Sequence, residues 1–336
     1  MTRDLRGVED GFARWLRHRR TDQGAVRAEL VTGGGYSNDI IFVDVGGEEL
    51  VLRLPPEGPG LFRTYDLEMQ VVVQDAARRG GVPVPSFVTV EADPEWIGAP
   101  FLLMPRVAGR VPGELAVADE WIMGLGSAGQ RTLHEGFLDA LALVHASPVE
   151  GLAGHLRGAG GPLVDEVDWW RDLVDWTFDG ATPTSLADGF AWCRAQVPDP
   201  VPPSGLLWGD VRLGNVVFGA DLEVRALLDW EMASLGPAES DVAWATALDE
   251  IAAALVGRRV PGFLDRDEIV ARHERALGRS LVAFRWFEIF AMLRAAALNV
   301  RTSTLAAART GKPARPPERD VVLRQCLAAI EAAGAF

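Results

Sequence analysis

The segment 206–231 constrains this chain more than any other, because it sets three polar side chains at the ends of short apolar runs. Asp210 and Asn215 lie on a polar loop between two such runs, and Asp229 ends a third. A tight turn at 219–221 would fold Asp229 back beside Asn215. Two carboxylates and an amide then converge at one end of a small sheet. Oxygen ligands of this kind suit Mg²⁺, which takes one or two carboxylates together with substrate phosphates.

The spacing is that of phosphoryl-transfer enzymes of the protein-kinase type. These use an aspartate base, an asparagine five residues later for the metal, and a further aspartate after a hairpin. An aspartate and an asparagine at this distance arise often by chance, but the flanking apolar runs and the sequence Leu-Asp-Trp-Glu at 228–231 make the pattern specific. The alternative interpretation is that Asp210 and Asn215 form turns and that Asp229 caps a helix.

Composition argues against several other classes of protein. The 336 residues carry 33 basic and 47 acidic side chains, a net charge of −14, which disfavours nucleic acid as the main partner. The one lysine, Lys312, precedes Pro313, so the phosphate loop GxxxxGK[ST] cannot occur, and HExxH, CxxC and GxSxG motifs are absent. Two cysteines exclude a disulfide scaffold, and no apolar stretch reaches the ~18–20 residues of a membrane span. We therefore expect a cytoplasmic protein with neither a nucleic acid nor a membrane as its partner.

Periodicity divides the chain into a β-rich first part and a mainly helical second part. In the first part, strands are expected at 27–32, 38–45, 48–54, 87–90 and 101–105, and helices at 8–20 and 62–80. In the second part, helices are expected at 130–146, 165–178, 184–195, 238–256, 266–277, 281–304 and 317–333. This predicts an α+β fold with an N-terminal lobe over 1–105 and a C-terminal lobe over 106–336.

Seven stretches of the chain match one family of kinases. They are Thr-Gly-Gly-Gly-Tyr-Ser-Asn at 32–38, Val-Leu-Arg-Leu-Pro-Pro at 51–56, Gly-Val-Pro-Val-Pro at 81–85, 98–105, Leu-Ala-Leu-Val-His at 141–145, 206–231, and Glu-Ser-Asp-Val-Ala-Trp at 239–244. With them the chain resembles the aminoglycoside-phosphotransferase-like kinases, and among these the branch associated with acyl-CoA dehydrogenases. The resemblance covers nearly the whole chain. It implies a bilobal, protein-kinase-like fold, with a small antiparallel-sheet lobe, a larger mainly helical lobe, and ATP between them.

The resemblance also implies roles for individual residues. Asp210 is the expected catalytic base, and Asn215 and Asp229 are the expected ligands of Mg²⁺. The residues expected to bind ATP lie in the first lobe and in the hinge that follows it: Gly34, Gly35 and Ser37 over the phosphates, Arg53 at the phosphates, Glu68 paired with Arg53, and Met104 and Arg106 in the hinge, whose backbone groups bond the adenine.

Two positions depart from the usual pattern. Trp208 stands where the family usually has histidine, and it either fills the same volume by packing or marks lost or altered activity. Arg53 stands where kinases use lysine, but a guanidinium fork suits phosphate, and arginine here resembles the acyl-CoA-associated branch. Asp241 is expected to bond the backbone of the catalytic loop, and His145 and Trp244 are expected to be structural.

These features predict a small-molecule kinase that depends on ATP and Mg²⁺, a phosphotransferase with an alcohol group as acceptor. We expect a largely apolar acceptor such as a hydroxyacyl compound, with Arg171, Arg294 and Arg301 as candidates for the phosphates of a CoA thioester. Two alternatives stay open: a catalytically silent nucleotide- or ligand-binding protein of kinase shape, and a phosphotransferase of aminoglycoside or macrolide antibiotics. The identity of the acceptor, the choice between ATP and GTP, and the oligomeric state are left open as well.

Overall fold

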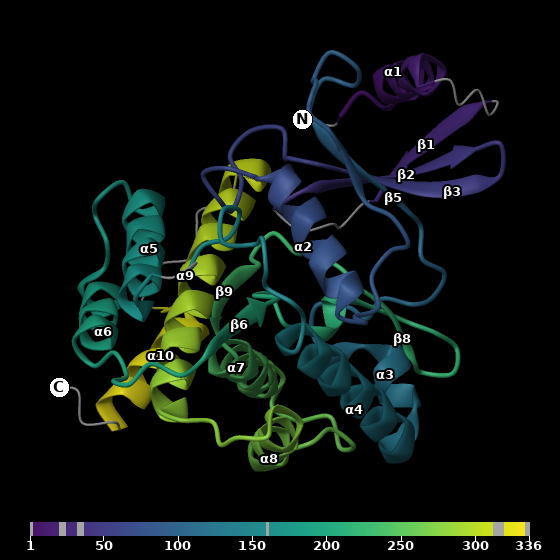
Figure 1. Ribbon diagram of the computed structural model, residues 1–336. Coiled ribbons are helices and arrows are strands. Elements are labelled where there is room, and N and C mark those ends of the chain that lie inside the picture. The colour runs from purple at the N-terminus through teal and green to yellow at the C-terminus, as the bar shows by residue number, and fades with distance from the viewer. Residues whose placement is uncertain (1–2, 20–24, 32–36, 159–160, 312–318, 333–336) are drawn as a thin grey trace. The chain divides into compact units, whose positions relative to one another are not determined.

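The computed structural model describes residues 3–19, 25–31, 37–158, 161–311 and 319–332. The chain divides into two compact units. The first comprises Met1–Val71 and Pro85–Val107, and the second comprises Val72–Val84 and Ala108–Phe336. The first unit contains a five-stranded sheet, and the second contains most of the helices (Figure 1).

The sheet of the first unit is antiparallel throughout, with the strand order β1-β2-β3-β5-β4. Its strands are β1 (Val26–Leu30), β2 (Asp39–Val45), β3 (Glu48–Leu54), β4 (Thr89–Glu91) and β5 (Phe101–Pro105). A two-residue turn joins β2 to β3, and both of its residues, Gly46 and Gly47, have positive φ angles of 62° and 96°. Such a turn needs φ above zero at both positions, which is why two glycines form it.

Helix α1 (Leu5–His18) covers one face of this sheet. Its apolar residues recur at helical spacing and include Val8, Phe12 and Trp15, all of them buried. They join one apolar core with alternating residues of the strands, among them Ile41 and Leu52. Burial of this apolar surface therefore organises the first unit.

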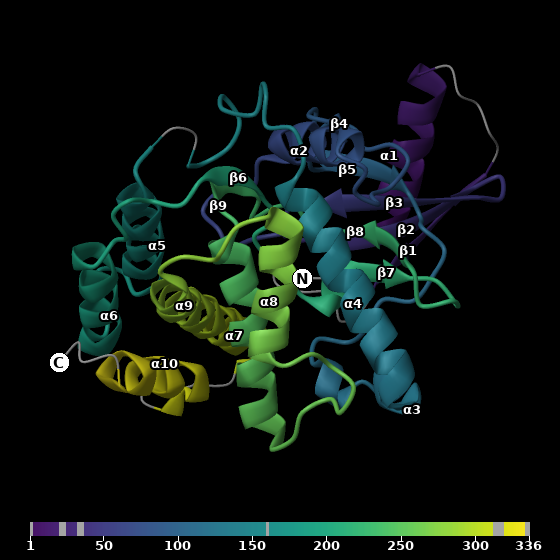
Figure 2. The same cartoon turned by 60° about the horizontal axis from the view of Figure 1, so that its bottom comes forward.

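The helices of the second unit pack around a long central helix. The unit contains α3 (Glu120–Gly124), α4 (Gly126–His145), α5 (Leu163–Thr177), α6 (Thr184–Ala195), α7 (Glu239–Val256), α8 (Arg266–Leu277), α9 (Phe284–Thr310) and α10 (Val321–Ala332). Helix α2 (Leu67–Arg79) is divided between the two units. The long helix, α9, contacts α5, α6, α7 and α10 (Figure 2). No helix in the described part of the chain is both long and apolar enough to span a membrane.

Two short antiparallel ribbons interrupt these helices. One pairs β6 (Ser204–Leu207) with β9 (Ser234–Pro237), and the other pairs β7 (Val216–Phe218) with β8 (Val224–Leu227). The sequence predicted a single small sheet without β9, and this was wrong. The Ser-Leu-Gly-Pro of β9 contains turn-forming residues, and only its pairing with β6 makes it a strand.

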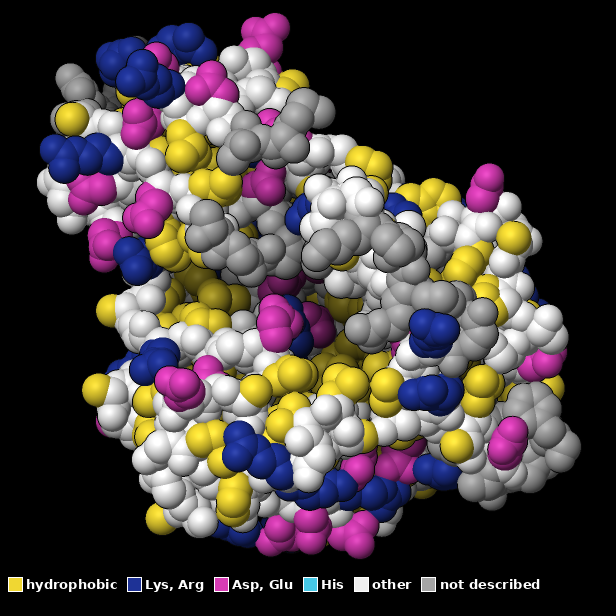
Figure 3. All heavy atoms as spheres, turned by 180° about the vertical axis from the view of Figure 1, so that it is seen from behind, with side chains coloured by type: hydrophobic (Ala, Val, Ile, Leu, Met, Phe, Trp, Pro, Cys, Tyr) yellow, Lys and Arg dark blue, Asp and Glu magenta, His cyan; other side chains and the backbone are white. Residues whose placement is uncertain are grey.

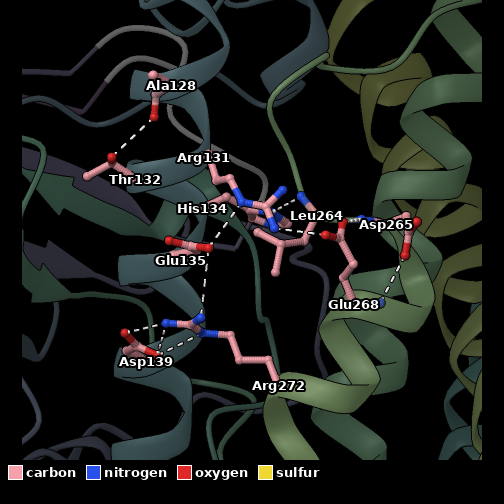
Figure 4. A network of polar contacts seen from close by, with 10 residues as sticks. All are labelled: Ala128, Arg131, Thr132, His134, Glu135, Asp139, Leu264, Asp265, Glu268 and Arg272. Atoms are coloured by element: carbon pink, nitrogen blue, oxygen red, sulfur yellow. Dashed lines mark hydrogen bonds and ion pairs between the residues drawn. The ribbon is translucent and has the colours of Figure 1, made fainter.

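Charged side chains join α4 to α8 (Figure 4). Arg131 contacts Glu135 of its own helix at 3.2 Å and Glu268 of α8 at 2.8 Å, and Arg272 of α8 contacts Asp139 at 2.7 Å. Acidic and basic side chains also lie next to one another along the lower edge of the face in Figure 3. These exposed ion pairs link α4 and α8, the two helices that also carry His145 and His273.

The predicted α+β fold is confirmed. The expected strands at 48–54 and 101–105 coincide with β3 and β5, and the expected helix at 184–195 coincides with α6. The five-residue helix α3 was not predicted, because it is too short to show helical periodicity. Helix α9 runs to Thr310 and is longer than the predicted 281–304.

Candidate active site

One buried carboxylate, that of Asp241, supports the loop between β6 and β7, which is the predicted catalytic loop. Asp241, in the first turn of α7, accepts hydrogen bonds from the backbone N–H of Trp208 at 2.8 Å and from that of Gly209 at 3.0 Å. Gly209 has a φ of 90°, and a Cβ there would lie 2.3 Å from the carbonyl oxygen of Met232. Only glycine fits this position. The expectation that Asp241 bonds the catalytic-loop backbone is confirmed.

Two buried histidines extend this support to α4 and α8. His145 Nε2 lies 3.1 Å from Asp241 Oδ2, and His145 Nδ1 lies 2.7 Å from His273 Nε2. Both contacts are satisfied by neutral rings if His145 donates to Asp241 and His273 donates to His145. Burial, and next the neighbouring His145, lower the pKa of His273 to about 3. A line of hydrogen bonds therefore runs from α8 to the loop, and sequence reasoning missed His273.

The carboxylate of Asp210 accepts three side-chain hydrogen bonds. Its Oδ2 accepts from Arg212 Nε at 2.8 Å and from Asn215 Nδ2 at 2.8 Å. Its Oδ1 accepts from Trp244 Nε1 at 3.3 Å. The side chain of Asp210 is 16% exposed, so it is accessible from one side only. Its orientation is thus set by donors from the loop and from α7.

Arg212 is a further charged residue of this loop, which sequence reasoning missed. Its guanidinium forms ion pairs with Asp210 and with the carboxylate of Glu114. Burial by itself lowers the pKa of Arg212, but the charges of Asp210, Glu114 and Asp229 outweigh it and raise the pKa above its ordinary value. A permanent positive charge therefore lies among three acidic groups. The signal in the sequence is a basic residue two positions after the aspartate.

The β7–β8 ribbon brings Asn215 and Asp229 to the same end. Val216 pairs with Leu227, and the N–H of Leu228 donates to the carbonyl oxygen of Asn215 at 2.8 Å. Asp229 follows with a φ of 59°, in the left-handed region that non-glycine residues rarely adopt. Strained backbone of this kind persists only where its surroundings enforce it.

Trp208 holds this end of the ribbon. Its indole is fully buried and packs against Phe137 and Trp230, with ring centroids 6.3 and 6.1 Å apart. Its Nε1 donates to the carbonyl oxygen of Leu228 at 2.9 Å, directly before Asp229. The tryptophan therefore fills the volume by packing and ties the catalytic loop to the residue that precedes Asp229.

The chemistry of Asn215 and Asp229 fits a nucleotide-bound cation. The amide nitrogen of Asn215 is engaged with Asp210, which leaves its carbonyl oxygen as the atom for a metal. One amide oxygen and one carboxylate suit Mg²⁺, which takes its other ligands from phosphates and water. In the described part of the chain, no group of three or more His, Cys, Asp or Glu side chains gathers as it would around a metal. Asn215 and Asp229 by themselves are therefore an incomplete ligand set for Mg²⁺.

The ATP-binding residues predicted in the first unit lie on β2, β3, β5 and α2 or close to them. Ser37 is buried just before β2, and Arg53 is buried on β3, opposite Ile40 and Leu102. Glu68 is exposed in the first turn of α2. Gly34 and Gly35 lie outside the described residues. The roles predicted for these residues stay predictions.

The predicted hinge residues end β5. Met104 is buried opposite Val51. The backbone N–H of Arg106 donates to the carbonyl oxygen of Glu49 at 3.0 Å, and its guanidinium lies 2.7 Å from the carboxylate of the same residue. The backbone N–H of Arg106 is thus engaged within the sheet.

These features agree with the comparisons with known proteins. The model of the phosphotransferase enzyme family matches residues 29–279, which is most of the chain. The chain therefore belongs to this family, and the predicted enzyme class, a phosphotransferase, is confirmed.

Curated relatives are longer proteins. The chain is 27% identical over 263 residues to acyl-CoA dehydrogenase family member 11 of Gallus gallus, covering 71% of this chain and 32% of that protein. It is 27% identical over 215 residues to acyl-CoA dehydrogenase family member 10 of Mus musculus, covering 62% of this chain and 19% of that protein. The chain spans about a third or less of the length of these relatives.

Solved structures share the fold at low sequence identity. A thermostable mutant of aminoglycoside phosphotransferase APH(4)-Ia, in a ternary complex with AMP-PNP and hygromycin B, superposes with a TM-score of 0.65 at 14% identity, covering 98% of this chain and 99% of that one. Macrolide 2'-phosphotransferase type I superposes with a TM-score of 0.54 at 18% identity, covering 98% of both chains. The predicted kinase-like fold is therefore confirmed.

Proposed function

We propose that this chain is a kinase that uses ATP and Mg²⁺ to phosphorylate a hydroxyl group of a small molecule. The observation that carries the proposal is the arrangement of Asp210 and Asn215, which are hydrogen-bonded to each other, with Asp229 at the same end of the β7–β8 ribbon. AMP-PNP in a structural neighbour supports ATP as the phosphoryl donor. ATP is preferred over GTP on that ground.

The polar residues of the site have different roles in the proposed transfer. The oxygen of the acceptor hydroxyl bonds to the γ-phosphorus, the bond from that phosphorus to the ADP oxygen breaks, and the hydroxyl proton passes to Asp210. Asn215 and Asp229 would hold the cation, which when bound would neutralise charge on the phosphates. Arg212 keeps a positive charge close to Asp210 and Asp229 throughout. Catalysis rests mainly on positioning and on charge stabilisation.

The contacts of Trp208 favour an active enzyme over a silent kinase-like protein. The indole fills a buried volume and donates to the residue before Asp229, so it contributes to the geometry of the metal ligands. A silent site has no need to keep Asp210, Asn215 and Asp229 in this arrangement. The replacement of the usual histidine is thus compatible with turnover.

We propose a hydroxyacyl-type compound as the acceptor. The names of the curated relatives, acyl-CoA dehydrogenase family members, support this class. Two of the arginines considered for CoA phosphates are buried against tryptophan rings. The guanidinium groups of Arg294 and Arg301 lie 4.9 and 4.1 Å from the rings of Trp170 and Trp176. The proposed specificity therefore rests on recognition of the acyl part of the substrate and not on binding of CoA phosphates by these two residues.

Calorimetry of ATP binding, with and without Mg²⁺, tests the nucleotide site. Wild type should bind ATP in a Mg²⁺-dependent manner, and Asp229→Asn should lose that dependence. Asp221→Asn is the matched control, since Asp221 lies in the turn of the same ribbon and pairs with Arg225 at the surface. Absence of Mg²⁺-dependent binding in wild type contradicts the proposal.

Turnover on a panel of hydroxyacyl compounds tests the transfer itself. Asp210→Asn should bind ATP as wild type does and lower the transfer rate by about 1000-fold, because the proton acceptor is gone. Binding without transfer to any acceptor or to water supports the silent protein. Transfer to an aminoglycoside or macrolide, with none to hydroxyacyl compounds, supports an antibiotic phosphotransferase.

A further inference from the structure

One donor to the candidate catalytic carboxylate comes from outside the catalytic loop. Trp244, on α7, donates its indole N–H to Asp210 Oδ1 at 3.3 Å, while Oδ2 accepts from Arg212 and Asn215. A carboxylate oxygen has room for two donors. Among the described residues, Oδ2 therefore has both positions filled, and Oδ1 keeps one for the acceptor hydroxyl. Trp244 sets the direction of this oxygen.

The indole is itself clamped. Trp244 is 2% exposed, and the guanidinium of Arg294 lies 4.7 Å from its ring centroid and 4.9 Å from that of Trp170. Trp170 is anchored in turn, because its Nε1 donates to Glu166 at 3.0 Å. Burial lowers the pKa of Arg294 to about 10, so the guanidinium stays charged at neutral pH and keeps its attraction for both rings.

We propose that Trp244, clamped by Arg294, is a positioning residue for Asp210. The proposal rests on the proposed function, in which Asp210 receives the hydroxyl proton. An indole N–H donates a hydrogen bond but neither takes up nor releases a proton near neutral pH. Trp244 therefore orients Oδ1 without competing for the proton.

Trp244→Phe tests this role, because it keeps a buried ring and removes the N–H. Hydrolysis of Mg²⁺-ATP without acceptor is the first readout, and its kcat should fall about 10-fold, the effect of one lost hydrogen bond to a charged group. The Kd and the KM of Mg²⁺-ATP should stay within about twofold, so that the loss falls on kcat alone. A merely structural role would change KM and kcat together.

Trp286→Phe is the matched control. Trp286 is buried on α9 and donates its indole N–H to the carbonyl oxygen of Cys193 at 3.0 Å, so the substitution removes the same kind of bond away from Asp210. This control should keep the kcat and KM of wild type. Equal effects of the two substitutions would overturn the proposal.

A second readout separates this proposal from the proposed function. Carbon-13 NMR of labelled aspartate follows the carboxyl signal of Asp210, assigned by its loss in Asp210→Asn. Absence of ATP hydrolysis in wild type would contradict the proposed function, yet a changed chemical shift of the Asp210 carboxyl in Trp244→Phe, recorded at one fixed neutral pH, would still support the positioning contact. An unchanged chemical shift would overturn it. If Trp244→Phe does not fold, Arg294→Met replaces it, and an unchanged chemical shift and kcat there would overturn the clamp.

Discussion

The sheet of the first unit and the catalytic loop of the second are organised by different forces. In the sheet, Ile41 and Leu52 are completely buried beside Phe12 of α1, and apolar burial without strict direction holds the strands. In the catalytic loop, hydrogen bonds with defined partners hold the backbone, through Asp241, and the ribbon end, through Trp208. Hydrogen bonds are directional, and they fix individual atoms.

This difference follows from what each region has to place. The proposed phosphoryl transfer requires the oxygens of Asp210, Asn215 and Asp229 in set directions, and packing alone leaves such directions open. On the sheet, in contrast, the position of Arg53 along β3 follows from the register, in which Arg53 pairs with Leu102. Replacing polar side chains should therefore lower the free energy of unfolding strongly around the catalytic loop and only slightly at exposed positions of the sheet.

The largest effect is expected for Asp241→Asn. The asparagine amide offers one oxygen as an acceptor and an NH₂ group as a donor. Because the N–H groups of Trp208, Gly209 and His145 all point at this position, at least one of them would face the NH₂ group. We expect the free energy of unfolding of the second unit to fall by about 3 kcal/mol, as for a lost charged acceptor in a buried site. Urea denaturation measures this.

Asp139→Asn is the control for Asp241→Asn. Asp139 pairs with Arg272 at the surface and is 63% exposed, so its loss should cost about 1 kcal/mol or less. Equal costs for the two variants would show that the loop is not held by its polar contacts, and the comparison with the sheet would fail.

The free energy of unfolding should depend on pH through His273, which forms a buried pair with His145. His273 is neutral in the folded protein, with its pKa lowered from 6.5 to about 3. The unfolded chain binds the proton more readily, so this stabilisation is complete above about pH 6.5 and is lost as the pH falls toward the folded pKa. Between about pH 7 and pH 5, His273 should account for about 2 kcal/mol of lost stability.

Urea denaturation of wild type and of His273→Gln at both pH values measures this contribution. The variant is expected to be less stable than wild type at neutral pH, because the bond to His145 is disturbed, but to lose less on acidification. Parallel losses in both proteins would mean that His273 does not titrate on unfolding in this range.

The sequence allowed most of the fold to be predicted, because periodicity reports burial directly. The strands at 48–54 and 101–105 alternate or run apolar, and the helix at 184–195 lies between turn-forming residues. Helix α3 and strand β9 were missed. Both are too short for a period to be visible, and β9 exists only through its pairing with β6.

The site was predictable only in part, for a related reason. A hairpin places Asn215 beside Asp229 by local rules, so their proximity follows from the chain between them. The contact of Trp244 with Asp210 depends on how α7 packs against the loop, and the contact of His273 with His145 depends on how α8 packs against α4. Such contacts join residues far apart in sequence, and no spacing within one segment reports them.

A smaller effect is expected for Trp208→Phe. The substitution keeps an aromatic ring in the buried site but leaves the carbonyl oxygen of Leu228 without its indole donor. Stability should fall by about 1 kcal/mol, and the Mg²⁺-dependent affinity for ATP should fall about three- to tenfold, because Asp229 follows directly. Trp286→Phe should show a similar stability loss with wild-type affinity. Equal Mg²⁺-dependent affinities for ATP in the two variants would show that Trp208 does not support the proposed metal ligand Asp229.

The smallest effect is expected on the sheet, for Arg106→Gln. The ion pair with Glu49 joins side chains that are 43% and 62% exposed, and exposed pairs of this kind contribute little because water and salt screen them. Stability should change by less than about 0.5 kcal/mol. The hinge predicted here acts through backbone groups, which the substitution leaves in place, so ATP affinity should also stay within about twofold. A larger loss of affinity would mean that the Arg106 side chain contacts the nucleotide, and the sheet would then place a functional group by a directional contact, as the catalytic loop does.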